Sequence, residues 1–169
     1  MRILFFSFAL LLLMTSLHGQ IPSGKELINS SNANYEQEVL KLINVERGKR
    51  SMKALTWNDQ LANSARYHAN DMAVDDYFNH DSHDKKNKKL IKICGTFDRI
   101  KKFINPGMMA RSENIGAGQV TPKDIVKSWM NSPGHKKNIL DKDARYIGVG
   151  YILKEKSIFT HYWVMNNGI

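Results

Sequence analysis

The sequence has 169 residues, with 25 Lys and Arg against 16 Asp and Glu and a formal net charge of +9. This length suits a single domain with a hydrophobic core of its own. Because Cys94 is the one cysteine, an intramolecular disulfide is excluded, and Cys94 is either a buried thiol or free to pair between molecules. After residue 14, no segment approaches the about 20 apolar residues that a membrane helix needs.

The N-terminus has the pattern of a secretory signal peptide. Met1-Arg2 supplies a positive charge, and the apolar run from Ile3 to Met14 is too short to span a bilayer. We predict a signal peptide over residues 1–19 and export to the extracellular space or the periplasm. Residues 20–34 are rich in Ser and Asn, which predicts a flexible lead-in, and residues 35–169 then form the folded domain.

Two segments with helical periodicity follow the lead-in. Residues 35–48 and 59–72 carry apolar side chains at helical spacing, and Asp59 is in position to cap the second helix. His68 falls on the apolar stripe of that second helix. We therefore expect His68 to be a core side chain hydrogen-bonded to a neighbour.

Two further helices are predicted after a charged stretch without periodicity, residues 71–92. Residues 97–104 predict a short helix. Thr121 as cap, with proline next and Asp124 at the third position, marks the start of another helix, which Pro133-Gly134 ends.

After Leu140 the pattern changes to that of β-strands. Residues 147–153 and 158–165 are apolar and alternating, and the charged turn 154–157 joins them into a hairpin. The alternation places His161 on the same face as Trp163. Helices first and strands last predict an α+β layered domain.

Basic residues are concentrated between Lys85 and Lys102, where Asp98 is the one acidic residue. Such a run is either a solvated loop or a surface that attracts anionic lipid or acidic polysaccharide. Export and the absence of aromatic residues between the lysines disfavour nucleic acid as a partner. The basic residues in this stretch are Lys85, Lys86, Lys88, Lys89, Lys92, Arg99, Lys101 and Lys102.

Four polar residues are candidates for chemistry: His80, Glu113, His135 and His161. Clusters of imidazole and carboxylate groups bind metals or transfer protons. Known catalytic signatures are absent, since the chain has no His-Glu-x-x-His, no Cys-x-x-Cys and no Gly-x-Ser-x-Gly. The stretch from Phe78 to Asp84 has two imidazoles and two carboxylates but matches no established zinc or calcium spacing.

The motifs around these residues resemble those of the CAP superfamily, also called the SCP domain, which groups cysteine-rich secretory proteins, antigen 5 and pathogenesis-related proteins. The resemblance runs from about Tyr35 to Met165 and is greatest to the disulfide-free bacterial branch, in agreement with the single cysteine. It implies a three-layer α-β-α sandwich with a small central antiparallel sheet and a shallow polar cleft. The motifs are Phe78-Asn79-His80, Ser112 to Gly116, Trp129 to His135 with Asn138-Ile139-Leu140, and Ile147 to Gly150.

By this resemblance, His80 is the first cleft histidine and Glu113 is the glutamate of the Gly-Glu-Asn-Ile motif, with Ser112 in place of glycine. His161 resembles the histidine of the His-Tyr-Thr-Gln motif. However, Trp163-Val164 stand where Thr-Gln would be, and a shift of one residue would turn His161 to the opposite face.

The second acidic residue of the family's cleft is missing, because Asn131-Ser132 follow Trp129-Met130. His135 is common in the bacterial branch and is expected in that part of the cleft. The cleft would then hold three histidines and one carboxylate, a set that can bind zinc or another divalent metal, with His80 and His161 as ligands.

The leading hypothesis is a secreted, non-enzymatic CAP-domain protein whose cleft binds a divalent metal, a lipid or sterol, or a cell-envelope ligand. One alternative is a weak metal-dependent hydrolase with Glu113 as the base. Another is an adhesion module that acts through the lysine-rich segment.

Overall fold

The computed structural model describes residues 21–169, so the predicted signal peptide lies outside the described part of the chain. At its centre is a four-stranded sheet in the order β1-β5-β6-β4. Strand β6 pairs antiparallel with β4 and β5, whereas the two-residue β1 is parallel to β5. The strands are β1 (Thr56–Trp57), β4 (Ala110–Ala117), β5 (Tyr146–Leu153) and β6 (His161–Gly168).

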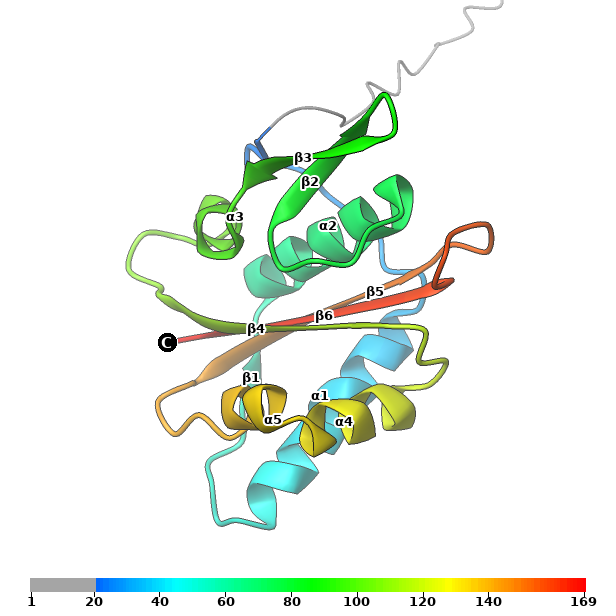
Figure 1. Ribbon diagram of the computed structural model, residues 1–169. Helices are drawn as coiled ribbons and strands as arrows, with labels where there is room; N and C mark the ends of the chain where they lie inside the picture. Colours follow the sequence, from blue (N-terminus) through cyan, green and yellow to red (C-terminus); the bar gives the residue numbers. More distant parts are fainter. Residues whose placement is uncertain (1–20) are drawn as a thin grey trace, which may run out of the picture.

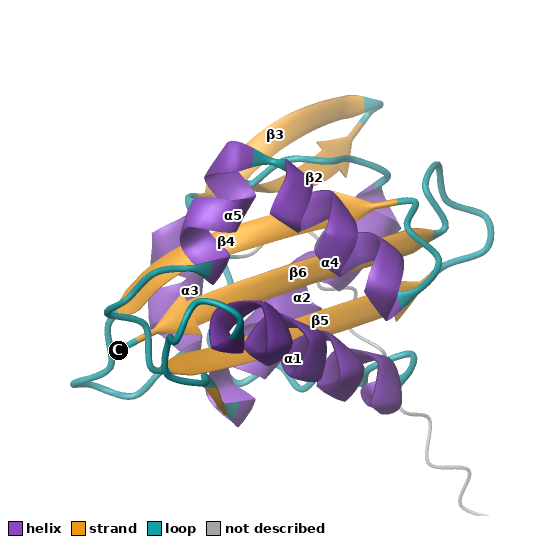
Figure 2. Ribbon diagram, turned by 90° about the horizontal axis from the view of Figure 1, so that it is seen from below, coloured by secondary structure: helices purple, strands orange, loops and turns teal. Residues whose placement is uncertain are grey.

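Helices cover both faces of this sheet, which confirms the predicted α-β-α sandwich (Figures 1 and 2). One layer holds α2 (Asp59–Asp75) and α3 (Thr96–Phe103). The other holds α1 (Ala33–Gly48), α4 (Pro122–Asn131) and α5 (Pro133–Ile139). Beside α2 lies a separate antiparallel hairpin, β2 (Ser82–Lys86) and β3 (Lys89–Cys94). Among residues 21–169, no helix has the length and apolar character to cross a membrane.

Side-chain caps fix the helix starts. Asn32 caps α1 by accepting from the Tyr35 N–H at 3.2 Å, and Thr121 caps α4 as predicted. For α2 the prediction was one residue off: the cap is Asn58, whose Oδ1 accepts from the Leu61 N–H at 2.9 Å, and Asp59 is the first helical residue.

Strand β6 contributes side chains to the hydrophobic cores on both sides of the sheet, because its successive residues point to opposite faces. Trp163 and Met165 pack with the α1 and α4 side chains, whereas Tyr162 and Val164 pack with α2. Helix α2 lies very close to β5, because a Cβ at Gly148 would come within 2.0 Å of the Ala62 backbone nitrogen. This close contact fixes the height of α2, and therefore of His68, above the sheet.

Five elements were not predicted from the sequence, namely β1, β2, β3, β4 and α5. The stretch 71–92, expected to be irregular, continues α2 to Asp75 and then forms the β2–β3 hairpin, whose exposed lysines hide the strand alternation. The Gly-rich segment around Glu113 is strand β4, buried over most of its length. Pro133 does end α4, but it also begins α5, where a proline fits the first turn.

Cys94 is buried at the end of β3, and burial raises the pKa of its thiol. This is the first of the two alternatives that the sequence left open.

The lead-in is tied to the domain, because the Ser31 N–H donates to the Tyr151 carbonyl at 3.1 Å.

Candidate functional site

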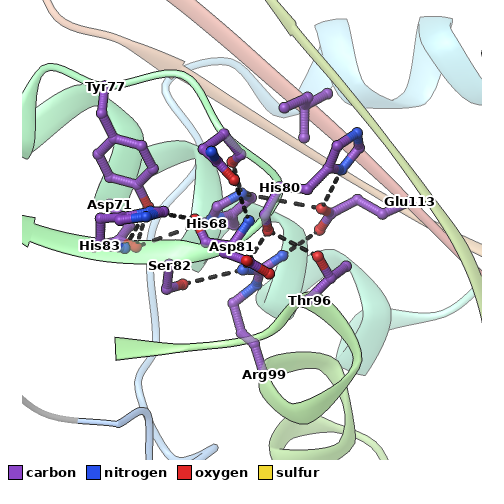
Figure 3. A network of polar contacts seen from close by, with 12 residues as sticks. His68, Asp71, Tyr77, His80, Asp81, Ser82, His83, Thr96, Arg99 and Glu113 are labelled. Carbon is purple, nitrogen blue, oxygen red and sulfur yellow. Dashed lines mark hydrogen bonds and ion pairs between the residues drawn. The ribbon is translucent and has the colours of Figure 1, made fainter. Parts of the chain in front are cut away.

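The site is organised around the carboxylate of Glu113, which β4 directs toward the α2 layer (Figure 3). Both of its oxygens are engaged. Arg99 Nη2 from α3 donates to Oε2 at 2.5 Å, and His80 Nδ1 lies 3.0 Å from Oε1. The side chains of Glu113 and Arg99 are 1% and 0% exposed, so this ion pair is fully removed from water.

The charge of Glu113 is stabilised in place. Burial alone would raise the pKa of this carboxyl, but the charge of Arg99 and the hydrogen bonds from His80 and Arg99 hold it below its usual value. An ionised, buried carboxylate with both oxygens bonded is a poor proton acceptor. The geometry therefore argues against Glu113 as the general base of a hydrolase and gives it the role of orienting His80.

His80 is the exposed member of this pair. A carboxylate can only accept, so Nδ1 of His80 carries a proton, and in the neutral ring Nε2 has the lone pair. The side chain is 47% exposed. Its backbone carbonyl is also held, by Thr96 Oγ1 at 2.9 Å and Arg99 Nη1 at 3.1 Å. Arg99 thus positions His80 twice, through its main chain and through Glu113.

His68 supports the site from beneath and is not part of its surface. It is fully buried, and its Nε2 donates to the Asn79 carbonyl at 2.9 Å, which fixes the residue before His80. Burial and the charge of Arg99 lower the pKa of His68, which keeps the ring neutral. The prediction of a hydrogen-bonded core histidine is confirmed.

Helix α5 forms the other wall. Asn114 Nδ2 donates to the His135 carbonyl at 3.1 Å, and Asn138 Nδ2 donates to the Glu113 carbonyl at 3.2 Å. Burial lowers the pKa of His135, and nearby His80 lowers it further. His135 itself is not among the residues that line the cavity next to His80.

The structure does not bring His161 to this site, which corrects the pairing of His161 with His80 as metal ligands. His161 begins β6 with its ring directed to the α1 and α4 side, where its Nδ1 is 2.8 Å from the Tyr151 hydroxyl and the two rings stack. Glu113 faces the opposite side of the sheet, with Ile115 and the α2 core. The strand alternation that places Trp163 on the α1 and α4 side of the sheet places His161 on that side too.

Between these walls lies an open cavity of about 500 Å³ at the β4 edge of the sheet. Besides His80 and Glu113, it is lined by Asp81, Gly95, Thr96, Phe97, Asp98, Arg111, Ser112 and Asn138.

The donor set at the cavity suits a metal held by few protein ligands. Neutral imidazole is a ligand for zinc, and Glu113 supplies the carboxylate that usually orients a ligating histidine. Within residues 21–169, one group of three potential metal ligands has its ligand atoms within 4.8 Å of one another. It consists of Asp71, Asp75 and Asp84 and does not lie at the cavity. A metal bound at His80 would therefore keep most of its coordination positions open.

A comparison of the sequence with family models settles the family. The model of the cysteine-rich secretory protein family, CAP, matches residues 40–167. The chain belongs to the CAP family. This CAP domain is 39% identical over 135 residues to YkwD of Bacillus subtilis (strain 168), covering 80% of this chain and 49% of YkwD. It is 32% identical over 115 residues to the membrane protein YlbC of the same organism, covering 68% of this chain and 31% of YlbC. The chain spans half or less of the length of these curated relatives.

Solved structures agree with the fold. An extracellular protein of Bacillus anthracis with an SCP domain is 26% identical, with a TM-score of 0.63 over 79% of this chain and 40% of that one. An outer surface protein of Borrelia burgdorferi has a TM-score of 0.65 at 19% identity, over 84% of this chain and 98% of that one. At that identity, the second similarity concerns the fold alone.

Arg99 is the functional residue that the sequence reading missed, because it was counted with the surface lysines. A signal was present: Arg99 immediately precedes Ile100 and lies four residues before Phe103, which places it on the buried side of α3. A charge on the apolar side of a helix requires a buried partner, and Glu113 is that partner.

Proposed function

We propose that this CAP domain is an exported, non-enzymatic binding protein whose cleft binds a divalent cation such as zinc through Nε2 of His80, with His135 as the second ligand. The observation that carries the proposal is the hydrogen bond from His80 Nδ1 to a Glu113 carboxylate anchored by Arg99. This bond fixes the tautomer that leaves Nε2 available to a ligand. The extracellular description of the Bacillus anthracis protein supports export.

Binding is favoured over catalysis by the state of the groups in the cleft. Glu113 is occupied by two partners, and no other carboxylate lining the cavity combines burial with a free oxygen next to His80. A cation on two imidazoles keeps open positions that water or an oxygen-rich cell-envelope ligand can fill. The cation would supply charge to hold that ligand, while Arg99 and Glu113 keep His80 in place.

Zinc titration by calorimetry tests the cleft. We expect wild type to bind, and His80→Ala and His135→Ala to lose most of the affinity, because each removes one of two ligands. The matched control is His161→Ala, which removes an imidazole on the opposite face of the sheet and should bind as wild type does. Absence of binding by wild type, or equal loss in all three variants, would contradict the proposal.

The pH dependence gives a second test. Protonated imidazole cannot ligate a metal, so zinc affinity should fall as the pH drops from 8 to about 5. The lowered pKa of His135 keeps that ligand neutral further into the acidic range. A flat affinity over this pH range would argue that zinc, if it binds, does not use the histidines.

For a lipid ligand, a groove outside the cleft has a more suitable lining. Between α1 and α4 lies a groove of about 310 Å³ with Leu42, Val45, Val126 and Met130 along its walls. Its lining also includes Lys49, Lys123 and Lys127, and this combination suits an acyl chain with an anionic head. Displacement of a fluorescent fatty acid would test this second candidate. We expect Val45→Asp to abolish binding and His80→Ala to leave it unchanged.

A further inference from the structure

The β2–β3 hairpin carries a concentrated positive charge. It holds five lysines and one aspartate, and that aspartate, Asp84, is buried. Lys92 is paired with Asp81 at 2.6 Å. The remaining four lysines are exposed at and beside the turn, and they are Lys85, Lys86, Lys88 and Lys89.

Three of these lysines are unfavourable for the hairpin itself. Lys86 and Lys89 are directly opposite each other across the two strands, and like charges at such positions destabilise a sheet. Lys88 lies in the turn with a φ of 65°, a left-handed conformation that favours glycine or asparagine. The stability of the hairpin therefore does not account for lysine at these positions.

The same hairpin exposes two large apolar side chains. Leu90 and Ile91 are 49% and 46% exposed, and as successive strand residues they point to opposite faces of the ribbon. Leu90 is directly opposite Lys85. In Figure 1 the hairpin turn points outward, away from the layer of α1, α4 and α5. The tip thus combines aliphatic side chains with long cationic ones that can extend their charged ends past them.

We propose that the β2–β3 hairpin docks the protein on an anionic lipid bilayer. The hairpin approaches the bilayer with its turn first, so the exposed lysines meet the acidic headgroups, and Leu90 and Ile91, one on each face of the ribbon, enter the interface between headgroups and acyl chains. A soluble polyanion would match the lysines equally well but would leave the two apolar side chains exposed to water. The docking surface is separate from the cleft, so it goes beyond the proposed binding function and stands without it.

Flotation with lipid vesicles tests the charge. The full chain without its predicted signal peptide is mixed with vesicles of phosphatidylglycerol and phosphatidylcholine, or of phosphatidylcholine alone. We expect binding to the first only, weakened by salt. Lys86→Gln with Lys89→Gln should lower the partition coefficient by roughly 20- to 30-fold. Lys154→Gln with Lys156→Gln removes the same charge from the β5–β6 turn and should change it far less.

A second pair of variants separates a bilayer from a soluble polyanion. Leu90→Ser with Ile91→Ser should lower vesicle binding by about tenfold and leave binding to soluble polyphosphate unchanged. The proposal is overturned if wild type ignores anionic vesicles, if it binds polyphosphate but not vesicles, or if the serine variant binds vesicles as wild type does. His80→Ala should float as wild type does, so this test fails or succeeds independently of the cleft. Circular dichroism checks that every variant is folded.

Discussion

The two faces of the central sheet give a polar side chain different surroundings. On the α2 face, Glu113 is surrounded by charged and hydrogen-bonding groups that fix its ionisation and orient His80. On the α1 face, His161 lies among aromatic rings, stacked on Tyr151. Both residues belong to conspicuous sequence motifs, yet only Glu113 reaches the cleft. The difference shows that the direction of a strand side chain, more than its chemical type, decides whether it joins a site.

The largest expected effect comes from the buried ion pair. Arg99→Ala leaves the Glu113 carboxylate buried without its main partner, which should lower the free energy of unfolding by about 3–5 kcal/mol. Arg111→Ala is the matched control. Arg111 lies at the exposed end of β4, the strand that carries Glu113, and pairs with Asp141 at 2.9 Å. Its loss should lower the free energy of unfolding by at most about 1 kcal/mol. Urea denaturation of the two variants measures the difference.

The double variant Arg99→Met with Glu113→Gln sharpens that result. With both charges removed, no uncompensated ion remains, so the loss of stability should be smaller than in Arg99→Ala alone. If Arg99→Ala and Arg111→Ala cost the same, the pair on the α2 face is not the desolvated element that the geometry indicates.

A smaller effect is expected from His68 as the pH falls. Its pKa is lowered in the folded protein, so the unfolded chain takes up the proton more readily. Stability is therefore complete above the unfolded pKa of about 6.5 and falls as the pH drops toward the folded value, by at most about 1.4 kcal/mol per pH unit.

His68→Gln provides the comparison, because the amide keeps a donor for the Asn79 carbonyl but does not titrate. Urea denaturation between pH 7 and pH 5 should give a steeper loss for wild type than for this variant. Parallel curves would mean that His68 is protonated as easily in the folded protein as in the unfolded chain.

The elements that the sequence predicts well are those with a clear apolar pattern. Helix α1 buries one stripe of side chains, and such periodicity is visible in the chain. Strand β6 is buried on both faces, but its apolar and aromatic run from Tyr162 to Met165 identifies it as a strand. Strand β4 is buried over most of its length and includes Ser112, Glu113 and Asn114, so it has no alternation to find. Its burial depends on partners from α3 and α5, which no periodicity within β4 itself reveals.

The candidate site divides in the same way. His80, Glu113 and His135 belong to motifs with specific neighbours, so the resemblance to the CAP family could point to them. Arg99 has no motif, because its role depends on where α3 packs against β4. The direction of His161 required the register of β6, since a shift of one residue would have turned it to the other face.

The smallest expected effect lies on the α1 face. Tyr151→Phe removes the hydroxyl that His161 Nδ1 contacts at 2.8 Å but keeps the ring that packs against Tyr35 and Trp163. A single hydrogen bond contributes about 0.5–1.5 kcal/mol, so the urea midpoint should fall slightly. Zinc affinity should stay at the wild-type value, because the sheet separates this pair from His80. A loss of zinc affinity in Tyr151→Phe would mean that the two faces are coupled through β6, and the separation of a polar binding face from an aromatic structural face would have to be abandoned.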